Sequence, residues 1–405
     1  ENNNKSILDQ IITNQQAEEV ARMDAVEIIN DLFNELNARE RDVLMRRFGL
    51  HGQGYETLEK IGQAHNLTRE RIRQIQSNSV KKIRELKNLE NYISGLRSVI
   101  HQLMGEHGGL MERGYLLNNL VNLSLGGVKA DKESEENHKA HLDFLISKLL
   151  HNEFKEVNGS SGFKNSFKLK HQNIEHLELL ADELVGKIKS LKRVLETKEI
   201  INLIQELENF KNNQEKLQTE NNIDISNILG GDHFEEKTNL INANKILYTI
   251  LQASKDIEQN KFGYWGIYDW REIKPKTIND KIYLILKNYN KPMHFAEIAK
   301  KINEVGFDKK IANAATVHNE LILDDKYTLV GRGLYALKEK GYQNGTVSDI
   351  VENILKNSEQ PLTKEEIINE VAKQRVVKKA TINLALMDKD KFIREDGKYK
   401  INILQ

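Results

Sequence analysis

The sequence of 405 residues lacks cysteine altogether and contains only three prolines. Without cysteine the chain can form neither disulfides nor thiolate metal sites, which suits a reducing cytoplasm. No apolar run approaches the ~20 residues that span a bilayer, and the polar stretch that opens at Glu1 is unlike a signal peptide. We therefore expect a cytoplasmic protein without membrane contact. Because residue 1 is Glu rather than Met, the true N-terminus is left open.

Net charge and catalytic motifs are absent as well. Lys and Arg number 60, as do Asp and Glu, so the overall charge draws the chain toward no particular partner. Positive charge is instead concentrated locally, in residues 68–87. The sequence has no phosphate-binding loop of the Walker type, no HExxH zinc motif and no cysteine nucleophile, and its twelve histidines are scattered. We expect no enzymatic activity, no cofactor and no metal.

A stretch near the N-terminus, residues 36–86, has the order of a DNA-binding helix-turn-helix. Asn37 is followed three residues later by a glutamate, the spacing of a capping box, and the helix that starts there ends at Gly49. A second, short helix begins after Thr57, whose hydroxyl can cap it. It ends at Asn66, which tolerates the left-handed backbone of a tight turn.

The third helix of this stretch begins at Thr68 and carries the functional prediction. Apolar residues recur at helical spacing at Ile72, Ile75, Val80 and Ile83 and must face a core. The opposite face holds Arg, Gln and Glu, which can hydrogen-bond to bases, and Lys, which can contact phosphates. A merely solvated face is the alternative, but the preceding short helix and tight turn favour DNA recognition. The predicted DNA-binding residues are Thr57, Thr68, Arg69, Glu70, Arg73, Gln74, Ser77, Lys81, Lys82 and Arg84.

The runs ARERDVLMRRFGL, TLEKIGQAHNLTRERIRQIQ and KKIREL resemble region 4 of the sigma-70 family of bacterial RNA polymerase sigma factors, over about residues 36–87. The resemblance implies that Arg69, Glu70, Arg73 and Gln74 read the minus-35 promoter element. It also implies that Thr57 contacts a phosphate and that the apolar surface of the first helices binds the polymerase flap. Two positions depart from the family pattern, Gln76 in place of Glu and Asn78 in place of Lys, which affects the expected sequence preference.

Residues 1–35 are predicted to form a lead-in helix to this module. Their apolar stripe consists of Ile28, Ile29, Leu32 and Phe33. No segment with exposed aromatics, as promoter-melting sigma factors carry, precedes the module. We therefore expect the protein to recognise a promoter element without opening the DNA.

The predicted fold class is mainly α, a sigma region 4 helix-turn-helix followed by tandem winged-helix modules with small β-hairpin wings. Residues 1–88 form the first domain. Residues 89–172 form a winged-helix-like module with helices over 89–106, 112–123 and 141–151, a hairpin around the NGSSG tip, and a loop over 129–139.

Residues 173–275 are predicted as a helical module with an aromatic wing. Leucines and isoleucines from Leu179 to Leu195 predict a long helix, which either packs within its own chain or forms a coiled coil. Residues 211–222 are predicted to be a linker or a mobile loop, and residues 246–253 a helix. The run FGYWGIYDW favours packed strands over a base-stacking platform.

Residues 276–342 form a clearer winged helix, with helices over 277–286, 294–302 and 311–323. The runs KPMHFAEIAKKI, TVHNELI and VGRGLYAL resemble the HARE-HTH family, which includes the N-terminal domain of the RNA polymerase delta subunit. DNA contact and protein contact are both compatible with this resemblance. Its implied DNA contacts are Lys309, Lys310, Thr316, His318, Asn319 and Arg332.

Residues 343–405 repeat the winged-helix layout. Thr363 and Glu366 have capping-box spacing, residues 380–387 form the third helix, and Asp396 begins a two-residue hairpin turn. Lys378 and Lys379, with Arg394, Lys398 and Lys400, form either a phosphate-binding patch or a merely soluble surface.

The favoured function is a sequence-specific, sigma-like transcription factor at the nucleoid that binds double-stranded promoter DNA and bacterial RNA polymerase core. One alternative is an architectural DNA-binding protein without polymerase. Another is the recognition subunit of a DNA-processing or restriction system. The target genes, activation versus repression and the oligomeric state are left open.

Overall fold

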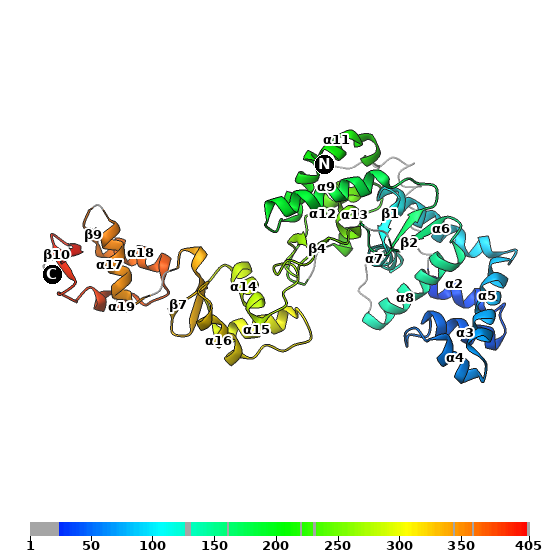
Figure 1. Cartoon of the computed structure of the whole chain (residues 1–405), viewed down its shortest axis with the longest axis horizontal. Helices are drawn as coiled ribbons and strands as arrows, with labels where there is room; N and C mark the ends of the chain where they lie inside the picture. The colour runs from blue at the N-terminus through cyan, green and yellow to red at the C-terminus, as the bar shows by residue number, and fades with distance from the viewer. Residues whose placement is uncertain are drawn as a thin grey trace, which may run out of the picture. The chain divides into compact units, whose positions relative to one another are not determined.

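Helices make up most of the chain, as the sequence predicts (Figure 1). The computed structural model describes residues 24–125, 131–159, 162–218, 221–229, 232–342, 345–358 and 360–402. The chain divides into unit 1, Glu1–Gln259 with Gly263–Tyr268, and unit 2, Asn260–Phe262 with Asp269–Gln405. No helix in the described ranges is long and apolar enough to cross a membrane. The same ranges contain no group of three or more His, Asp or Glu placed to hold a metal ion.

Unit 1 begins with the predicted helix-turn-helix. Its helices are α2 (Ala25–Phe33), α3 (Ala38–Phe48), α4 (Leu58–His65) and α5 (Arg69–Arg84). The lead-in helix is confirmed for its described part, α2, while residues 1–23 lie outside the described residues. Val43, Ile61 and Ile72, from α3, α4 and α5, are fully buried together. The apolar positions assigned to the core side of α5 therefore do hold the three helices together.

The caps of these helices are those that the sequence predicts. Asn37 and Glu40 form a capping box at the start of α3, which ends at Gly49 with a φ of 66°. Thr57 and Thr68 each accept a hydrogen bond from the backbone three residues on, at the starts of α4 and α5. Asn66 ends α4 in the left-handed region, with a φ of 54°. These local signals fix where each helix begins and ends.

The next part of unit 1 combines three helices with a small sheet. Its elements are α6 (Leu89–Glu106), β1 (Leu110–Glu112), α7 (Arg113–Ser124), α8 (Lys132–Phe144), the π-helix η1 (Leu145–Leu149), β2 (Phe154–Val157) and β3 (Ser166–Leu169). The three strands form an antiparallel sheet in the order β1-β3-β2. The predicted hairpin is thus present as β2 and β3, although Ser160 and Ser161 of its tip lie outside the described residues.

The loop predicted over residues 129–139 is wrong for its described part. Residues 132–139 belong to α8, while residues 129 and 130 lie outside the described residues. The side chain of Asp131 accepts a hydrogen bond from the backbone N–H of Ser134, at 2.8 Å. Glu133 and Glu135 add negative charge to the first turn, where the helix dipole favours it. The same charged residues that resemble a loop therefore start a helix.

The remainder of unit 1 is helical with one two-stranded sheet. Its elements are α9 (Glu175–Leu191), α10 (Thr197–Glu206), α11 (Glu208–Asn212), η2 (Gln214–Leu217), η3 (Ser226–Ile228), α12 (Thr238–Ala243), α13 (Lys245–Ala253), β4 (Ile257–Gln259) and β5 (Trp265–Ile267). Four apolar residues of α9, Leu177, Leu180, Leu184 and Ile188, are fully buried within the chain. The interpretation of α9 as a helix packed in its own chain is the one that the burial supports.

Two details of this part concern sequence predictions. The linker predicted over 211–222 is wrong up to Leu217, because residues 211 and 212 end α11 and residues 214–217 form η2. Glu183 of α9 accepts hydrogen bonds from the backbone N–H groups of Glu208 and Asn209 and thereby caps α11. The aromatic run forms packed structure, as expected. Trp265 is buried in β5, and its indole N–H donates to the Thr197 hydroxyl at 2.9 Å.

Unit 2 contains two parts with the same order of elements. The first has α14 (Ile278–Tyr289), β6 (Met293–His294), α15 (Phe295–Val305), α16 (Ala314–Leu323), β7 (Tyr327–Gly331), β8 (Leu334–Leu337) and the short 3-10 helix η4 (Lys338–Lys340). The second has α17 (Val347–Asn357), β9 (Leu362–Thr363), α18 (Lys364–Gln374), α19 (Lys379–Ala385), β10 (Phe392–Glu395) and β11 (Lys398–Ile401). In each part the short strand after the first helix pairs with the last strand of the hairpin.

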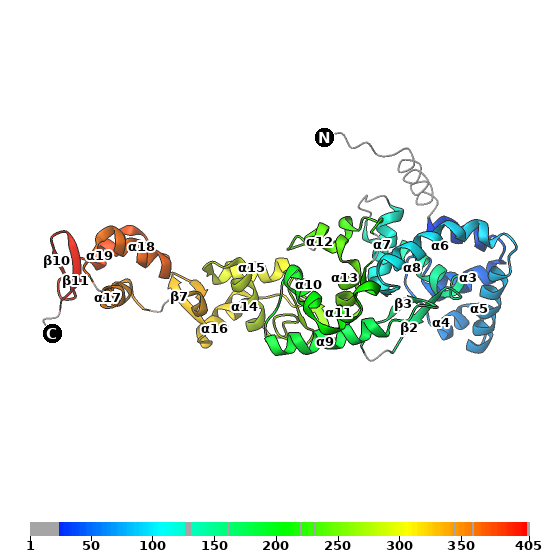
Figure 2. The same ribbon diagram turned by 90° about the horizontal axis from the view of Figure 1, so that it is seen from above.

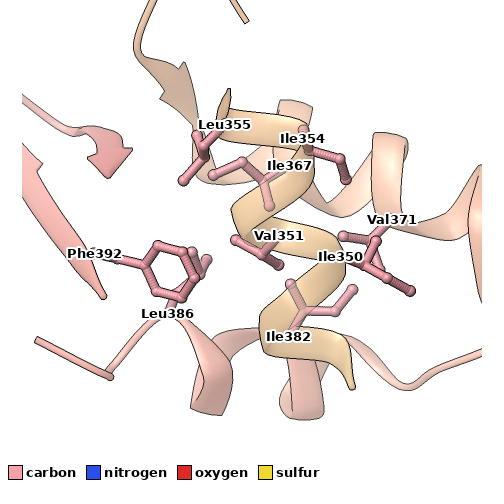
Figure 3. Close-up of a cluster of buried hydrophobic side chains, with 9 residues drawn as sticks. All are labelled: Ile350, Val351, Ile354, Leu355, Ile367, Val371, Ile382, Leu386 and Phe392. Carbon is pink, nitrogen blue, oxygen red and sulfur yellow. The ribbon is translucent and has the colours of Figure 1, made fainter. Parts of the chain in front are cut away.

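The last part of unit 2 has its own core. Figure 3 shows the nine buried side chains contributed by its three helices and by β10, namely Ile350, Val351, Ile354, Leu355, Ile367, Val371, Ile382, Leu386 and Phe392. Figure 2 shows the β10–β11 hairpin next to α17. The hairpin turns through Asp396 and Gly397, both with positive φ, at 46° and 81°. The predicted capping box of Thr363 and Glu366 is confirmed.

Candidate DNA-binding surface

Helix α5 is held in place by the tight turn and by a polar contact between α3 and α4. A Cβ atom on Gly62 of α4 would lie only 2.6 Å from the carbonyl oxygen of Leu67, so glycine is needed in α4 where the turn before α5 passes close to it. Nε2 of His65, the last residue of α4, lies 2.7 Å from Oδ2 of Asp42 in α3. The same carboxylate accepts a hydrogen bond from Nε of Arg46 at 2.9 Å. The helix before the turn is therefore tied to α3 at its end.

The predicted base-reading residues share the solvent face of α5. Arg69, Glu70, Arg73 and Gln74 are all exposed, as is Ser77. Arg73 donates two hydrogen bonds to the carboxylate of Glu70, at 2.8 and 2.6 Å. This contact lowers the pKa of Glu70 and raises the pKa of Arg73. Because the pair is exposed, both groups can exchange this contact for one with a base.

The predicted phosphate contacts differ in their availability. Thr57, Thr68 and Lys81 are exposed, and Lys81 has only a loose contact with Glu85, at 3.7 Å. Lys82 is also exposed, and its ammonium nitrogen lies 3.4 Å from Oε2 of Glu40 in α3.

Arg84, one of the predicted DNA contacts, forms a hydrogen bond to a part of its own chain outside the helix-turn-helix. It is half-buried, and its Nε donates a hydrogen bond to the carbonyl oxygen of Lys148 in η1 at 2.6 Å. Burial lowers the pKa of its guanidinium group. Arg84 therefore connects α5 to the part of unit 1 that follows it, a contact between residues far apart in sequence that no local pattern reveals.

Glu56, which sequence reasoning missed, organises the loop that leads into α4. Its side chain is almost fully buried, and its Oε1 lies 3.5 Å from both Nη1 of Arg46 and Nζ of Lys60. Its carbonyl oxygen accepts a hydrogen bond from Nη1 of Arg47 at 2.9 Å. These contacts fix the residue directly before Thr57. No spacing or motif in the sequence distinguishes Glu56 from the many exposed glutamates.

The apolar surface of the first helices is covered within the chain. Ile28, Ile29, Leu32 and Phe33 of α2 are all buried. The ring of Phe144, from α8, lies 5.9 Å from that of Phe33 and 4.9 Å from that of Phe48. Phe144 therefore occupies part of the surface that the sigma resemblance assigns to the polymerase flap.

In unit 2 the predicted DNA contacts lie on a different kind of surface. Lys309 and Lys310 are exposed before α16, and Arg332 is exposed between β7 and β8. His318 is half-buried, its ring 4.5 Å from that of Phe295 and 5.8 Å from that of Tyr335. Packing among rings leaves His318 little freedom to reach a base.

The exposed faces of the third helices in unit 2 are mainly apolar. Thr316 and Asn319 are exposed on α16, beside Ile322 and Leu323, which are 62% and 80% exposed. Lys378 and Lys379 are exposed at the start of α19, whose later turns expose Leu384 (69%) and, just beyond the helix, Met387 (71%). Neither surface repeats the mixture of Arg, Glu and Gln that α5 presents.

The helix-turn-helix has recognisable relatives. Residues 32–85 match the family model of sigma-70, region 4. The RNA polymerase sigma factor SigA1 of Synechococcus elongatus is 46% identical to this chain over 67 residues. SigA of Microcystis aeruginosa is 45% identical over 67 residues, and SigA of a Nostoc species is 48% identical over 58 residues.

The matches cover a small part of each chain. The SigA1 match spans 16% of this chain and 17% of the relative, and the Nostoc match spans 14% and 15%. No solved structure matches the chain significantly. The region 4 match indicates a sigma-like DNA-binding segment.

Proposed function

We propose that the protein is a sequence-specific DNA-binding transcription factor that recognises a promoter element through α5. The observation that carries this proposal is the row of exposed Arg, Glu and Gln side chains on α5, inside the segment that matches region 4. Arg69 and Arg73 would pair with guanine, Gln74 with adenine and Glu70 with cytosine. Hydroxyl and lysine side chains beside them, those of Thr57, Thr68, Ser77, Lys81 and Lys82, would contact phosphates and fix the register.

We also propose that the region 4 segment associates with bacterial RNA polymerase core. The relatives that support this are named as RNA polymerase sigma factors. Because Phe144 already packs against Phe33 and Phe48, polymerase would bind either beside α8 or after α8 has moved away. Purification of tagged full-length chain from cells, followed by detection of polymerase subunits, tests the association. The absence of polymerase, with DNA binding intact, would favour the architectural alternative.

Three parts of the chain are proposed to be winged-helix modules, over residues 89–172, 276–342 and 343–405. Their support is a common layout: a helix, a short strand, two helices and a hairpin whose last strand pairs with the short one. The resemblance to the HARE-HTH family applies to the second of these. Since the exposed face of α16 is largely apolar, we propose that Lys309, Lys310 and Arg332 contribute at most phosphate contacts.

The decisive experiment is selection of bound sequences from random duplex DNA by the full chain, followed by binding measurements on the selected and a scrambled duplex. A promoter-like consensus with preference for the selected duplex supports the proposal. Equal affinity for both duplexes would support an architectural protein. A consensus without polymerase, but with a copurifying nuclease, would support the recognition subunit of a DNA-processing system.

A further inference from the structure

Four basic side chains gather where the C-terminal end of α5 meets the following part of unit 1. Arg84 comes from α5, Lys148 from η1, His151 from the turn after η1, and Lys170 from the residue after β3. We call these four residues the basic cluster. Arg84 Nε donates a hydrogen bond to the Lys148 carbonyl oxygen at 2.6 Å, which joins two of the four residues, and Lys170 N–H donates to the Glu153 carbonyl oxygen at 2.9 Å.

The charge of the basic cluster is not neutralised by nearby carboxylates. Among the residues that the structure describes, neither Lys148 nor Lys170 forms an ion pair. The carboxylate of Glu153 contacts two residues outside the cluster instead. It lies 3.3 Å from Nη1 of Arg97 and 2.8 Å from Nε2 of His101. Slight burial lowers the pKa of His151, and the charges of Arg84, Lys170 and Lys148 lower it further. The basic cluster is therefore a region of positive potential.

The neighbouring hairpin extends this potential. Lys155 of β2 lies directly opposite Lys168 of β3, two residues before Lys170. Like charges directly opposite each other are unfavourable in an isolated sheet. A polyanion bound along the hairpin would relieve this repulsion.

The position of the basic cluster relates it to the reading face of α5. Helix α5 has 16 residues, which places Arg84 about 22 Å from Arg69 at 1.5 Å per residue. His151 and Lys170 are exposed, and Lys148 is half-buried. The basic cluster is thus continuous with α5 but lies beyond the bases that its first two turns can reach.

We propose that the basic cluster binds phosphates of the duplex DNA that flanks the element read by α5. The proposal rests on the proposed function, since the basic cluster can meet flanking DNA only if α5 binds a duplex. The hydrogen bond from Arg84 to the Lys148 carbonyl fixes the cluster relative to the recognition helix. Each phosphate contact releases condensed counterions, so the cluster adds affinity and salt dependence without adding sequence preference.

Two duplexes test this proposal with the full chain. The short duplex contains the selected sequence with about two base pairs on each side, and the long duplex adds about ten base pairs, one helical turn, on each side. The variants are Lys148→Ala with Lys170→Ala, and Lys170→Glu alone, which changes an exposed side chain and leaves the core intact. The control is Lys187→Ala with Lys189→Ala, two exposed lysines of α9 in the same unit.

The expected result is a loss confined to the long duplex. There, the double variant should lower the slope of log Kd against log salt by about two, at about 0.9 per lost phosphate contact. Lys170→Glu should weaken binding of the long duplex further, and the control should leave both duplexes unchanged. The His151 imidazole, followed by NMR, should show a higher pKa with the long duplex than with the short one.

Three outcomes separate failure of this proposal from failure of the proposed function. If wild type prefers the selected sequence but both cluster variants bind the long duplex with unchanged affinity and salt slope, the flanking contact is overturned and α5 recognition stands. If a cluster variant instead keeps its DNA binding but no longer copurifies with a protein that wild type retains, the proposed phosphate contact is overturned in favour of an acidic protein partner. If wild type shows no sequence preference at all, the proposed function itself fails.

Discussion

Arg84 and Lys148, 64 positions apart in the sequence, are joined by a hydrogen bond of 2.6 Å between the guanidinium Nε and a main-chain carbonyl oxygen. Arg84 is the last residue of the candidate recognition helix, and Lys148 belongs to the π-helix that follows α8. Together with the packing of Phe144 against Phe33 and Phe48, this bond attaches the helix-turn-helix to the next part of unit 1. A motion of one part would therefore be transmitted to the other.

Base reading by α5 can be separated from phosphate binding by two substitutions. Arg73→Ala should cost about 1 to 3 kcal/mol of binding free energy on the selected sequence, because a paired contact with guanine is lost. Lys82→Ala should weaken all sequences alike and lower the salt slope by about one. Gel shifts over a salt series measure both. An equal loss on selected and random duplexes from Arg73→Ala would argue against base reading.

The bond between Arg84 and Lys148 predicts a local stability effect. Arg84→Ala should make the joint between α5 and η1 less stable by about 1 to 2 kcal/mol, since a hydrogen bond from a charged donor is lost and the carbonyl oxygen is left without that donor. Hydrogen exchange should show faster exchange at the end of α5 and in residues 145–151. Arg84→Lys keeps the charge but not the planar donor and should restore little of the protection. Unchanged exchange in both variants would mean that the bond contributes nothing to the joint.

The buried pair of Lys245 and Glu106 predicts a larger effect. The ammonium nitrogen of Lys245 lies 2.5 Å from Oε2 of Glu106, and both side chains are almost fully buried. Glu106 also accepts hydrogen bonds from the backbone N–H groups of Asn222 and Ile223, at 3.0 and 3.2 Å. Lys245→Met should lower the free energy of unfolding of unit 1 by about 3 to 5 kcal/mol, because a buried carboxylate loses its partner. Denaturant unfolding measures the loss.

The control for this pair is the double variant Lys245→Met with Glu106→Gln, in which no buried charge remains. It should be more stable than Lys245→Met alone, since the neutral amide is easier to bury. If the double variant is as unstable as the single one, the loss would reflect packing around residue 245 rather than an unpaired charge.

His107 predicts a dependence of stability on pH. Burial lowers its pKa to about 3, although its Nδ1 lies 2.6 Å from the Leu103 carbonyl oxygen. The folded chain therefore keeps His107 neutral where the unfolded chain takes up a proton, so its contribution to stability is complete above the usual histidine pKa and falls as pH drops toward 3. The loss should approach about 1.4 kcal/mol per pH unit below about pH 6.

Urea unfolding of wild type, of His107→Gln and of His171→Gln, which changes an exposed histidine, between pH 7 and 4 tests this dependence. His107→Gln should flatten the pH profile, while His171→Gln should leave it as in wild type. A wild-type slope that persists in His107→Gln would assign the pH dependence to other groups.

The local part of the structure could be predicted from the sequence. Asn37, Thr57, Asn66 and Thr68 cap or end helices because their side chains or backbone preferences act within three residues. The exposed and buried faces of α5 follow from helical periodicity alone. Fold class and the candidate reading face both depend on such short-range signals.

The contacts that join the modules could not be predicted. Phe144 follows a charged segment that resembles a loop, yet it packs between Phe33 and Phe48. Glu56 is one glutamate among many until the folded chain buries it between Arg46 and Lys60. In both cases the contacting residues are distant in the sequence or follow no regular spacing. Composition and periodicity therefore cannot predict these contacts.

The ring of Phe144 also has a practical consequence for dissecting the molecule. If the chain were cut after residue 88, the rings of Phe33 and Phe48 would lose a covering neighbour and face water. An isolated N-terminal fragment should then self-associate or bind nonspecific apolar probes, whereas the full chain should not. The smallest well-behaved piece that retains α5 is thus expected to end beyond residue 149 rather than where the sigma-like motif stops.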